Sequence, residues 1–223
     1  MKKEVIIISL GGSIIVPDDI DVKFLKRFRE LILRYKRKYK FIIVAGGGST
    51  CRKYQRAAAR VRKMSQEDLD WIGIESTRFN AYLLKYIFGL KKDIIRNPTE
   101  KIRFDEDILI GSGWMPGCSS DKDAVLLAKN LKAKTVINIS NVEYLYDKDP
   151  NKYKYAKKIE KIDWKGFRKI IGDRWVPGLN KVFDPEAAKL AQRLGLRLIL
   201  VGNDINNMKK IFDKKPFKGS VVL

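Results

Sequence analysis

Residues 4–13 read EVIIISLGGS, a run of mostly branched apolar residues that ends in two glycines. A continuous apolar run of this length is typical of a strand buried inside a parallel sheet. The same arrangement returns at residues 41–48, FIIVAGGG, and at residues 108–113, ILIGSG. Three buried strands that each end in a glycine turn indicate an α/β fold whose loops meet at one edge of the sheet.

Helical segments are expected between and after these strands. Residues 21–38 carry apolar side chains on one face at helical spacing. Further helices are expected from about residue 49 and over 66–88, 121–131, 164–171, 185–194 and 205–212. Strands are expected over 135–139, 197–201 and 219–223, and residues 140–162 read as polar and aromatic loop. This alternation predicts a mostly parallel sheet with helices on both faces.

The chain is strongly basic, with 47 Lys and Arg against 26 Asp and Glu and a net charge of +21. Such a charge suggests either a nucleic-acid partner or a surface that attracts anionic small molecules. The cations are spread along the chain, without an aromatic RNA-binding motif or a Cys/His finger. The sequence therefore does not favour nucleic acid as the main partner.

Several classes of site are excluded by composition. The chain has no histidine, which rules out a Ser-His-Asp triad and a His-ligated metal. Cys51 and Cys118 stand apart, and two lone thiols fit a reducing compartment. No apolar run approaches the length of a membrane span or of a signal-peptide core, so we expect a cytosolic protein without a membrane partner. Phosphoryl transfer stays open, since it depends on positioning and cations.

The three glycine turns are candidate phosphate sites, because glycine lets backbone N–H groups approach phosphate oxygens closely. Any one of them alone is more often a tight turn. Arg52 comes four residues after Gly48. Its guanidinium either makes a bidentate contact with a phosphate or lies on the surface. Asp70 reads as a ribose ligand or as an acid on a helix face. Asp121 reads as part of the site or as a helix cap.

The order of these motifs resembles the UMP kinases of the amino-acid-kinase superfamily over nearly the whole chain. The stretches that carry the resemblance are Gly11-Gly12-Ser13, Val44–Gly48, Asp70-x-x-Gly73 with Thr77 and Asn80, Ser119-Ser120-Asp121, Asn141 through Pro150, and Asp184-Pro185 with Ala187-Ala188-Lys189. Together they are specific to the superfamily, and the segment at Asp70 points towards UMP kinase.

The resemblance implies a three-layer α/β/α sandwich, ATP and Mg²⁺ as cofactors, and transfer of the ATP γ-phosphoryl group to UMP. It implies a single domain over 1–223, with an acceptor lobe over roughly 1–125 and an ATP lobe over 126–223, and a homo-oligomer, usually a hexamer. The implied catalytic residues are Gly12, Ser13 and Asp121. The implied UMP-binding residues are Gly46, Gly47, Gly48, Arg52, Asp70, Gly73, Gly113, Ser119 and Ser120. The implied ATP-binding residues are Gly11, Gly12, Ser13, Asn141, Tyr146, Asp149 and Pro150.

Three departures from the family pattern stand out. Many relatives carry a lysine in the first glycine motif, where this chain reads Ser9-Leu10-Gly11. The usual Val-Asp-Gly-Val-Tyr is Val-Glu-Tyr-Leu-Tyr at residues 142–146. Residues 174–180 are an unusual insertion-like stretch, which we interpret as a nucleotide lid or, alternatively, as a packed turn. The alternatives are an isopentenyl phosphate kinase, which usually carries a histidine that this chain lacks, a nucleotide-binding member without turnover, and a nucleic-acid-binding protein.

Overall fold

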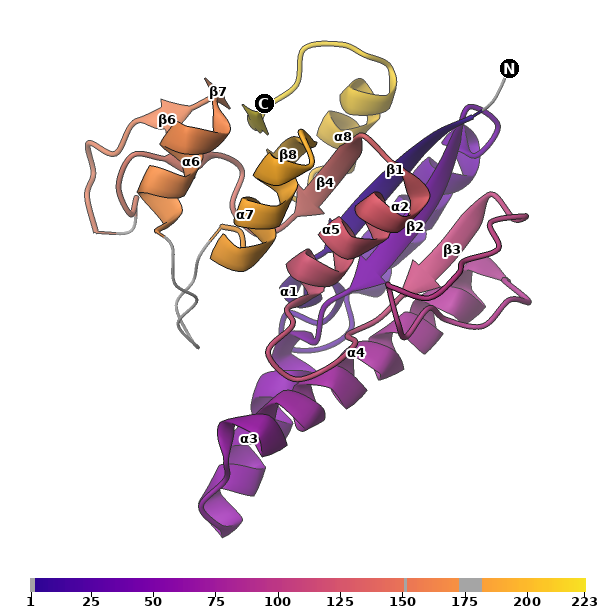
Figure 1. Ribbon diagram of the computed structural model, residues 1–223, viewed down its shortest axis with the longest axis vertical. Helices are drawn as coiled ribbons and strands as arrows, with labels where there is room; N and C mark the ends of the chain where they lie inside the picture. Colours follow the sequence, from indigo (N-terminus) through magenta and orange to yellow (C-terminus); the bar gives the residue numbers. More distant parts are fainter. Residues whose placement is uncertain (1–2, 151, 173–181) are drawn as a thin grey trace.

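A seven-stranded sheet forms the centre of the computed structural model, which describes residues 3–150, 152–172 and 182–223 (Figure 1). The strand order is β3 (Ile108–Gly111), β2 (Tyr39–Ala45), β1 (Glu4–Leu10), β4 (Thr135–Ile139), β8 (Arg197–Val201), β9 (Ser220–Val222) and β7 (Lys161–Ile162). The first five strands are parallel, whereas β9 runs antiparallel to β8. Because Leu10 pairs with both Ala45 and Ile139, the loops after these strands leave from the same edge.

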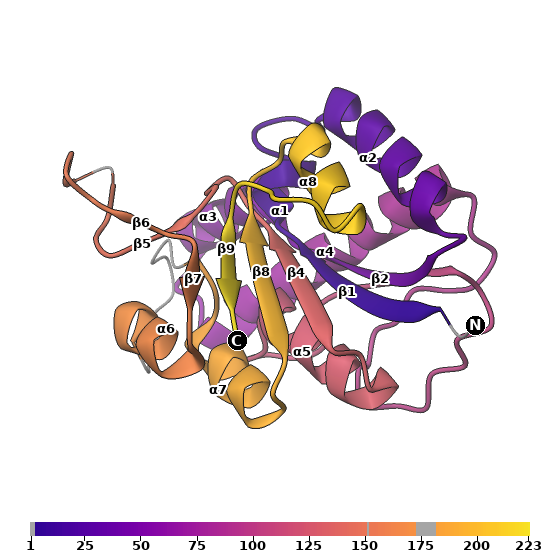
Figure 2. The ribbon, with the colours of Figure 1, turned by 90° about the horizontal axis from the view of Figure 1, so that it is seen from above.

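Helices cover both faces of the sheet, as Figure 2 shows. One face packs against α1 (Gly12–Ile15), α2 (Val22–Tyr35), α4 (Gln66–Phe88) and α8 (Ile205–Phe212). The other packs against α5 (Ser120–Leu131), α6 (Trp164–Ile171) and α7 (Pro185–Arg193). Alternate residues of β1 serve the two cores, with Ile6 and Ile8 on the first face and Ile7 on the second. The expected three-layer α/β/α sandwich is therefore confirmed.

One helix departs from these layers. The helix α3 (Gly48–Val61) packs along the first half of α4 and projects beyond the sheet (Figure 1). Only Gly48 and Ser49 of this helix are buried. The helix α4 begins with a capping box, in which Ser65 and Asp68 each bond the other's backbone N–H, and ends at Gly89 in a left-handed conformation. These two helices carry much of the candidate acceptor site.

Most element bounds match the prediction, and the differences have local causes. Residues 140–162 are not loop throughout, because β5 (Leu145–Tyr146) and β6 (Lys158–Ile159) form a hairpin. After β3 the chain forms a loop in which Gly117 has a φ of +74°, and α5 begins at Ser120, one residue before the predicted start. The expected boundary between lobes at 125/126 falls inside α5, and β1 pairs with β4 across it.

In the described part of the chain, no helix combines the length and the apolar character that crossing a bilayer requires.

Candidate active site

The first two glycine turns interlock at the carboxyl edge of the sheet. Gly46 N donates to Leu10 O at 3.0 Å. A Cβ atom added to Gly12 would lie 2.0 Å from Gly48 N, and Gly48 itself has a φ of +69°. The close backbone contact between the two turns therefore requires glycine at Gly12 and Gly48, whether or not a ligand binds there. The helices α1 and α3 both begin at this contact, and Ser49 N of α3 donates to Val16 O at 2.9 Å.

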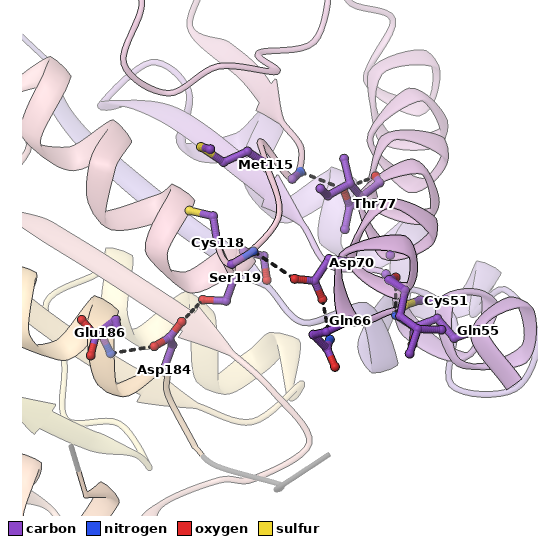
Figure 3. A pocket seen from close by; sticks show the side chains of 17 residues that line it. Cys51, Gln55, Gln66, Asp70, Thr77, Met115, Cys118, Ser119, Asp184 and Glu186 are labelled. Atoms are coloured by element: carbon purple, nitrogen blue, oxygen red, sulfur yellow. Dashed lines mark hydrogen bonds between the residues drawn. The ribbon is translucent and has the colours of Figure 1, made fainter. Parts of the chain in front are cut away.

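A pocket of about 360 Å³ lies beside these turns, between α3, the first half of α4, the loop 113–119 and the start of α7 (Figure 3). Six of the predicted acceptor residues line it, namely Gly47, Asp70, Gly73, Gly113, Ser119 and Ser120. The structure therefore gathers residues from three separate stretches of sequence around one cavity. Its size suits a ligand of nucleotide dimensions.

Asp70 connects two walls of this pocket. Its carboxylate accepts hydrogen bonds from Gln66 Nε2 at 2.8 Å and from Gly117 N at 2.9 Å. Asp70 thus holds the loop 113–119 against α4. A carboxylate offers about four acceptor positions, so Asp70 retains capacity for ligand hydroxyl groups. Gln66, which the sequence did not single out, shares this wall of the pocket.

Two polar residues of α4 hold the glycine turns in place. Asn80 Nδ2 donates to Gly46 O at 2.8 Å and to Gly47 O at 3.2 Å. Thr77 Oγ1 accepts from Gly113 N at 2.7 Å. The sequence analysis named both residues in a motif without indicating this role. The feature that could have indicated it is their separation of three residues, which places Thr77 and Asn80 on one side of the helix.

Arg52 lies next to Ser13, outside the residues that line the pocket. Its exposed guanidinium donates from Nη1 to Ser13 Oγ at 3.3 Å. Arg52 is the fifth residue of α3, one turn beyond Gly48, and Ser13 belongs to α1. Among the described residues Arg52 makes no ion pair, so the structure brings an unpaired cation close to the starts of two helices, a combination that favours an anion.

Asp121 is not the cap of α5, because Ser119 caps that helix through Lys122 N. The half-buried carboxylate of Asp121 instead accepts from Ser9 Oγ at 2.8 Å, from Asn138 Nδ2 at 2.8 Å and from Asp184 N at 3.2 Å. Burial raises the pKa of Asp121 to about 6, and the charge of Asp184 adds to this while the Ser9 bond opposes it. The alternative of a simple helix cap is wrong.

Asp184 completes this network and was not among the predicted site residues. It caps α7 by accepting from Glu186 N at 2.7 Å, and its other oxygen accepts from Ser119 Oγ. The sequence signal was Asp184-Pro185, an N-cap followed by a proline at the first helical position. Asp184 therefore links the acceptor pocket, which it lines, to Asp121 behind it.

A second carboxylic acid lies nearby without a predicted role. Asp123 is fully buried and accepts from Cys118 Sγ at 3.1 Å. Its Oδ2 has no hydrogen-bond partner among the described residues. Burial raises the pKa of Asp123 to about 7. The carboxyl anchors Cys118, which lines the pocket, from the helix side.

The predicted ATP residues are spread more widely than the acceptor residues. Asn141 is exposed two residues beyond β4, on the carboxyl edge of the sheet. Tyr146 lies in β5, while Asp149 and Pro150 lie in the connection to β6. Figure 2 shows this hairpin projecting from the body of the molecule. Residues 174–180, predicted to form a lid, lie outside the described residues.

Comparisons with known proteins show the family to which the chain belongs. The family model described as "Amino acid kinase family" matches residues 4–202. The uridylate kinase of Thermoplasma volcanium is 35% identical over 96% of this chain and 95% of its own length. That of Thermococcus onnurineus is 34% identical over 97% and 98%. The crystal structure of uridylate kinase from Archaeoglobus fulgidus, 28% identical, superposes with a TM-score of 0.85 over 98% of this chain and 99% of that one. The chain therefore belongs to the amino acid kinase family, within which it groups with the uridylate kinases.

Proposed function

We propose that the chain is a UMP kinase, which transfers the γ-phosphoryl group of ATP to UMP and yields UDP and ADP in pyrimidine nucleotide biosynthesis. The observation that carries this proposal is the pocket beside the interlocked glycine turns, where Asp70, Gly113 and Ser119 line a cavity of about 360 Å³. Its relatives over the full length are named uridylate kinases. We place the protein in the cytosol on the evidence of its two free thiols.

The acceptor would lie with its phosphate between Arg52 and the backbone of Gly47 and Gly48. The positive end of the α3 dipole lies there, and the guanidinium adds a charged fork. Asp70 would then face the ribose, with Gly73 leaving room beside it. The phosphate would point towards Gly12 and Ser13, where we place the transferred phosphoryl group.

The donor would approach from the side of β4 and β8. Asn141 leaves the sheet on that side, and we assign Tyr146, Asp149 and Pro150 to the adenosine of ATP. Phosphoryl transfer needs little covalent work from the protein and depends on holding donor and acceptor in line. The single sheet that connects both halves supplies this alignment, since β1 pairs with β2 on one side and with β4 on the other.

The main difference from the family pattern is the missing lysine, which in many relatives would offset the negative charge of the transferred phosphoryl group. Many relatives carry a lysine in the stretch that reads Ser9-Leu10-Gly11 here, and the Ser9 hydroxyl donates to Asp121. The described residues contain no cluster of three or more potential metal ligands. Mg²⁺ usually keeps several waters and binds through phosphate oxygens and one or two carboxylates, and we assign Asp121 and Asp184 as the carboxylates that would hold it. When bound, Mg²⁺ would neutralise charge on the phosphates.

We also propose that the protein is a homo-oligomer, a hexamer by resemblance. On the outer side of α3 and α4, Tyr54, Trp71 and Phe79 are exposed around an apolar hollow of about 470 Å³. An aromatic patch of this kind is typical of an interface between protein chains. Light scattering of the purified protein would measure the number of subunits, and a monomer would contradict the proposal.

A coupled assay of ADP release tests the function. With ATP and Mg²⁺, we expect UMP to be the preferred acceptor among nucleoside monophosphates, isopentenyl phosphate and amino acids. Preference for isopentenyl phosphate or for an amino acid would instead support another kinase of the family. Binding of UMP and ATP without any turnover would show a nucleotide-binding member that is not an enzyme.

Arg52→Ala is expected to raise the KM for UMP about ten- to a hundredfold and to raise the KM for ATP less. A lost hydrogen bond to a charged group costs roughly 1.5–3 kcal/mol. The matched control is Lys53→Ala, since Lys53 is the neighbouring exposed cation and donates to Asp18 O at 2.9 Å instead. Equal effects of the two variants, or an unchanged KM for UMP in Arg52→Ala, would show that Arg52 does not bind UMP and is an ordinary surface residue.

A further inference from the structure

Half of the net charge of this protein gathers in two segments that are far apart in the sequence. Residues 22–40 contain nine Lys and Arg and one Glu, and residues 204–218 contain five Lys and two Asp. Together these segments contribute +11 of the total +21. The sequence suggested cations spread along the chain, whereas the fold concentrates them.

The two segments lie side by side on one face of the molecule. The helices α2 and α8 pack next to each other over the same side of the sheet (Figure 2). Tyr35 and Phe212 hold them together with ring centroids 5.1 Å apart, and Tyr35 Oη donates to Asp213. Lys38 Nζ donates to Phe212 O at 3.3 Å. The two groups of cations therefore form one continuous surface, which we call the cationic face.

Most cations of the cationic face point to solvent, whereas Arg29 and Lys40 are half-buried. The apolar side of α2, which includes Phe24, Phe28 and Ile32, is buried in the core, so its charged side points outward. The exposed cations of the face are Lys23, Lys26, Arg27, Arg34, Lys36, Arg37, Lys38, Lys209, Lys210, Lys214, Lys215 and Lys218. Within the residues that the structure describes, none of these twelve takes part in an ion pair.

We propose that the cationic face binds the phosphate backbone of a nucleic-acid duplex, independently of its sequence. A helix of 14 residues such as α2 is about 21 Å long and carries cations at helical spacing along its outer side. A duplex presents one phosphate charge per ~1.7 Å of its axis, so a surface of this length can meet several phosphates at once. The released counterions would supply most of the binding free energy.

Two features favour a duplex over other polyanions. A peripheral membrane helix inserts its apolar side into the bilayer, whereas the apolar side of α2 is committed to the core. Proteins that bind single strands stack bases on exposed aromatic rings, whereas Tyr35 and Tyr39 on this side are buried. What remains is a charged surface without insertion or stacking groups, which suits a duplex read through its backbone.

This binding would be separate from catalysis. The acceptor pocket is built from α3, α4, the loop 113–119 and α7, and neither α2 nor α8 contributes a residue to it. A duplex on the cationic face would therefore leave the pocket open. The inference does not rest on the proposed function, and its test uses binding as well as turnover.

The test is fluorescence anisotropy of the full-length protein with a labelled DNA duplex of about 30 base pairs and arbitrary sequence, over a range of salt concentrations. The triple variant R27Q/R34Q/R37Q removes three exposed cations from α2 with little change in helix propensity. We expect the slope of log Kd against log salt to fall by about 2.7, because each lost phosphate contact removes about 0.9. Turnover and melting temperature should stay near those of the unmodified protein.

The matched control is K129Q/K165Q/K169Q, which removes three exposed cations from α5 and α6 on the opposite face of the sheet. This control should keep the unmodified salt slope. An equal decrease of the salt slope in both triple variants would overturn the proposal. It would show that the duplex responds to the overall positive charge of the protein and not to the cationic face. Release of the duplex by saturating ATP and UMP would place it at the glycine turns and also overturn the proposal. So would binding to anionic phospholipid vesicles without binding to the duplex.

Discussion

Asp121→Asn is expected to lower the turnover number by about 10²- to 10³-fold while the chain stays folded. The carboxylate lies where β1, β4, α5 and α7 meet, and it accepts hydrogen bonds from Ser9, Asn138 and Asp184. The substitution keeps the size of the side chain and removes its negative charge. In a centre that works by placing cations against phosphate oxygens, that charge matters far more than the shape of the group.

A control separates this effect from loss of a helix cap. Asp163 caps α6 by accepting from Gly166 N at 2.7 Å, and it is exposed. Asn and Asp cap helices about equally well, so Asp163→Asn should change neither turnover nor melting temperature noticeably. Near-normal turnover of Asp121→Asn, measured beside this control, would leave Asp121 with a structural role only. The centre of transfer would then have to lie around Ser13 and Asp184.

The pH dependence follows from the same carboxyl group. Its pKa is raised from 3.8 to about 6 in the folded protein, so the folded state binds the proton more tightly than the unfolded chain does. The contribution of this group to stability is therefore greatest below about pH 4 and is lost as the pH rises through 6. Turnover should fall below about pH 6 as the carboxylate takes up its proton, and Asp121→Asn should lack this dependence.

The sequence predicted the frame of the molecule well because that frame depends on local patterns. Buried strands and amphipathic helices have distinct periods, and the bounds 66–88, 135–139, 164–171 and 205–212 match the structure. The short helix α1 was missed because four residues carry no periodic signal. The hairpin of β5 and β6 was missed because strands of two residues are equally short.

The candidate site was harder to predict, since its bonds join residues far apart in the chain. The role of Asp121 depends on Asp184, which lies 63 positions further on. Asp70 was predicted to bind a ribose, and its bond to Gly117 across 47 positions is visible only in the fold. In the same way, no sequence pattern indicates that Lys38 and Phe212 are neighbours, although this contact builds the cationic face.

Gly12→Ala is expected to be the most damaging change to the glycine turns. The added Cβ would lie 2.0 Å from Gly48 N and 2.6 Å from both Gly46 C and Gly47 N. All three are backbone atoms, so no change of side-chain rotamer can relieve the overlap, and the two turns must separate. We expect the free energy of unfolding to fall by about 3 kcal/mol or more. Turnover should fall at least about a hundredfold, because a displacement near 1 Å at a reacting centre has this effect.

Gly89→Ala is the matched control for this substitution. Gly89 ends α4 with a φ of +67°, and no atom lies within 4 Å of a Cβ built there. Alanine should therefore cost only about 1 kcal/mol of conformational strain and leave turnover unchanged. The measurements are the free energy of unfolding in denaturant and the turnover number with UMP. If Gly12→Ala is no less stable than Gly89→Ala and keeps its turnover, the turns are not in contact, and their glycines must then be explained by a bound phosphate alone.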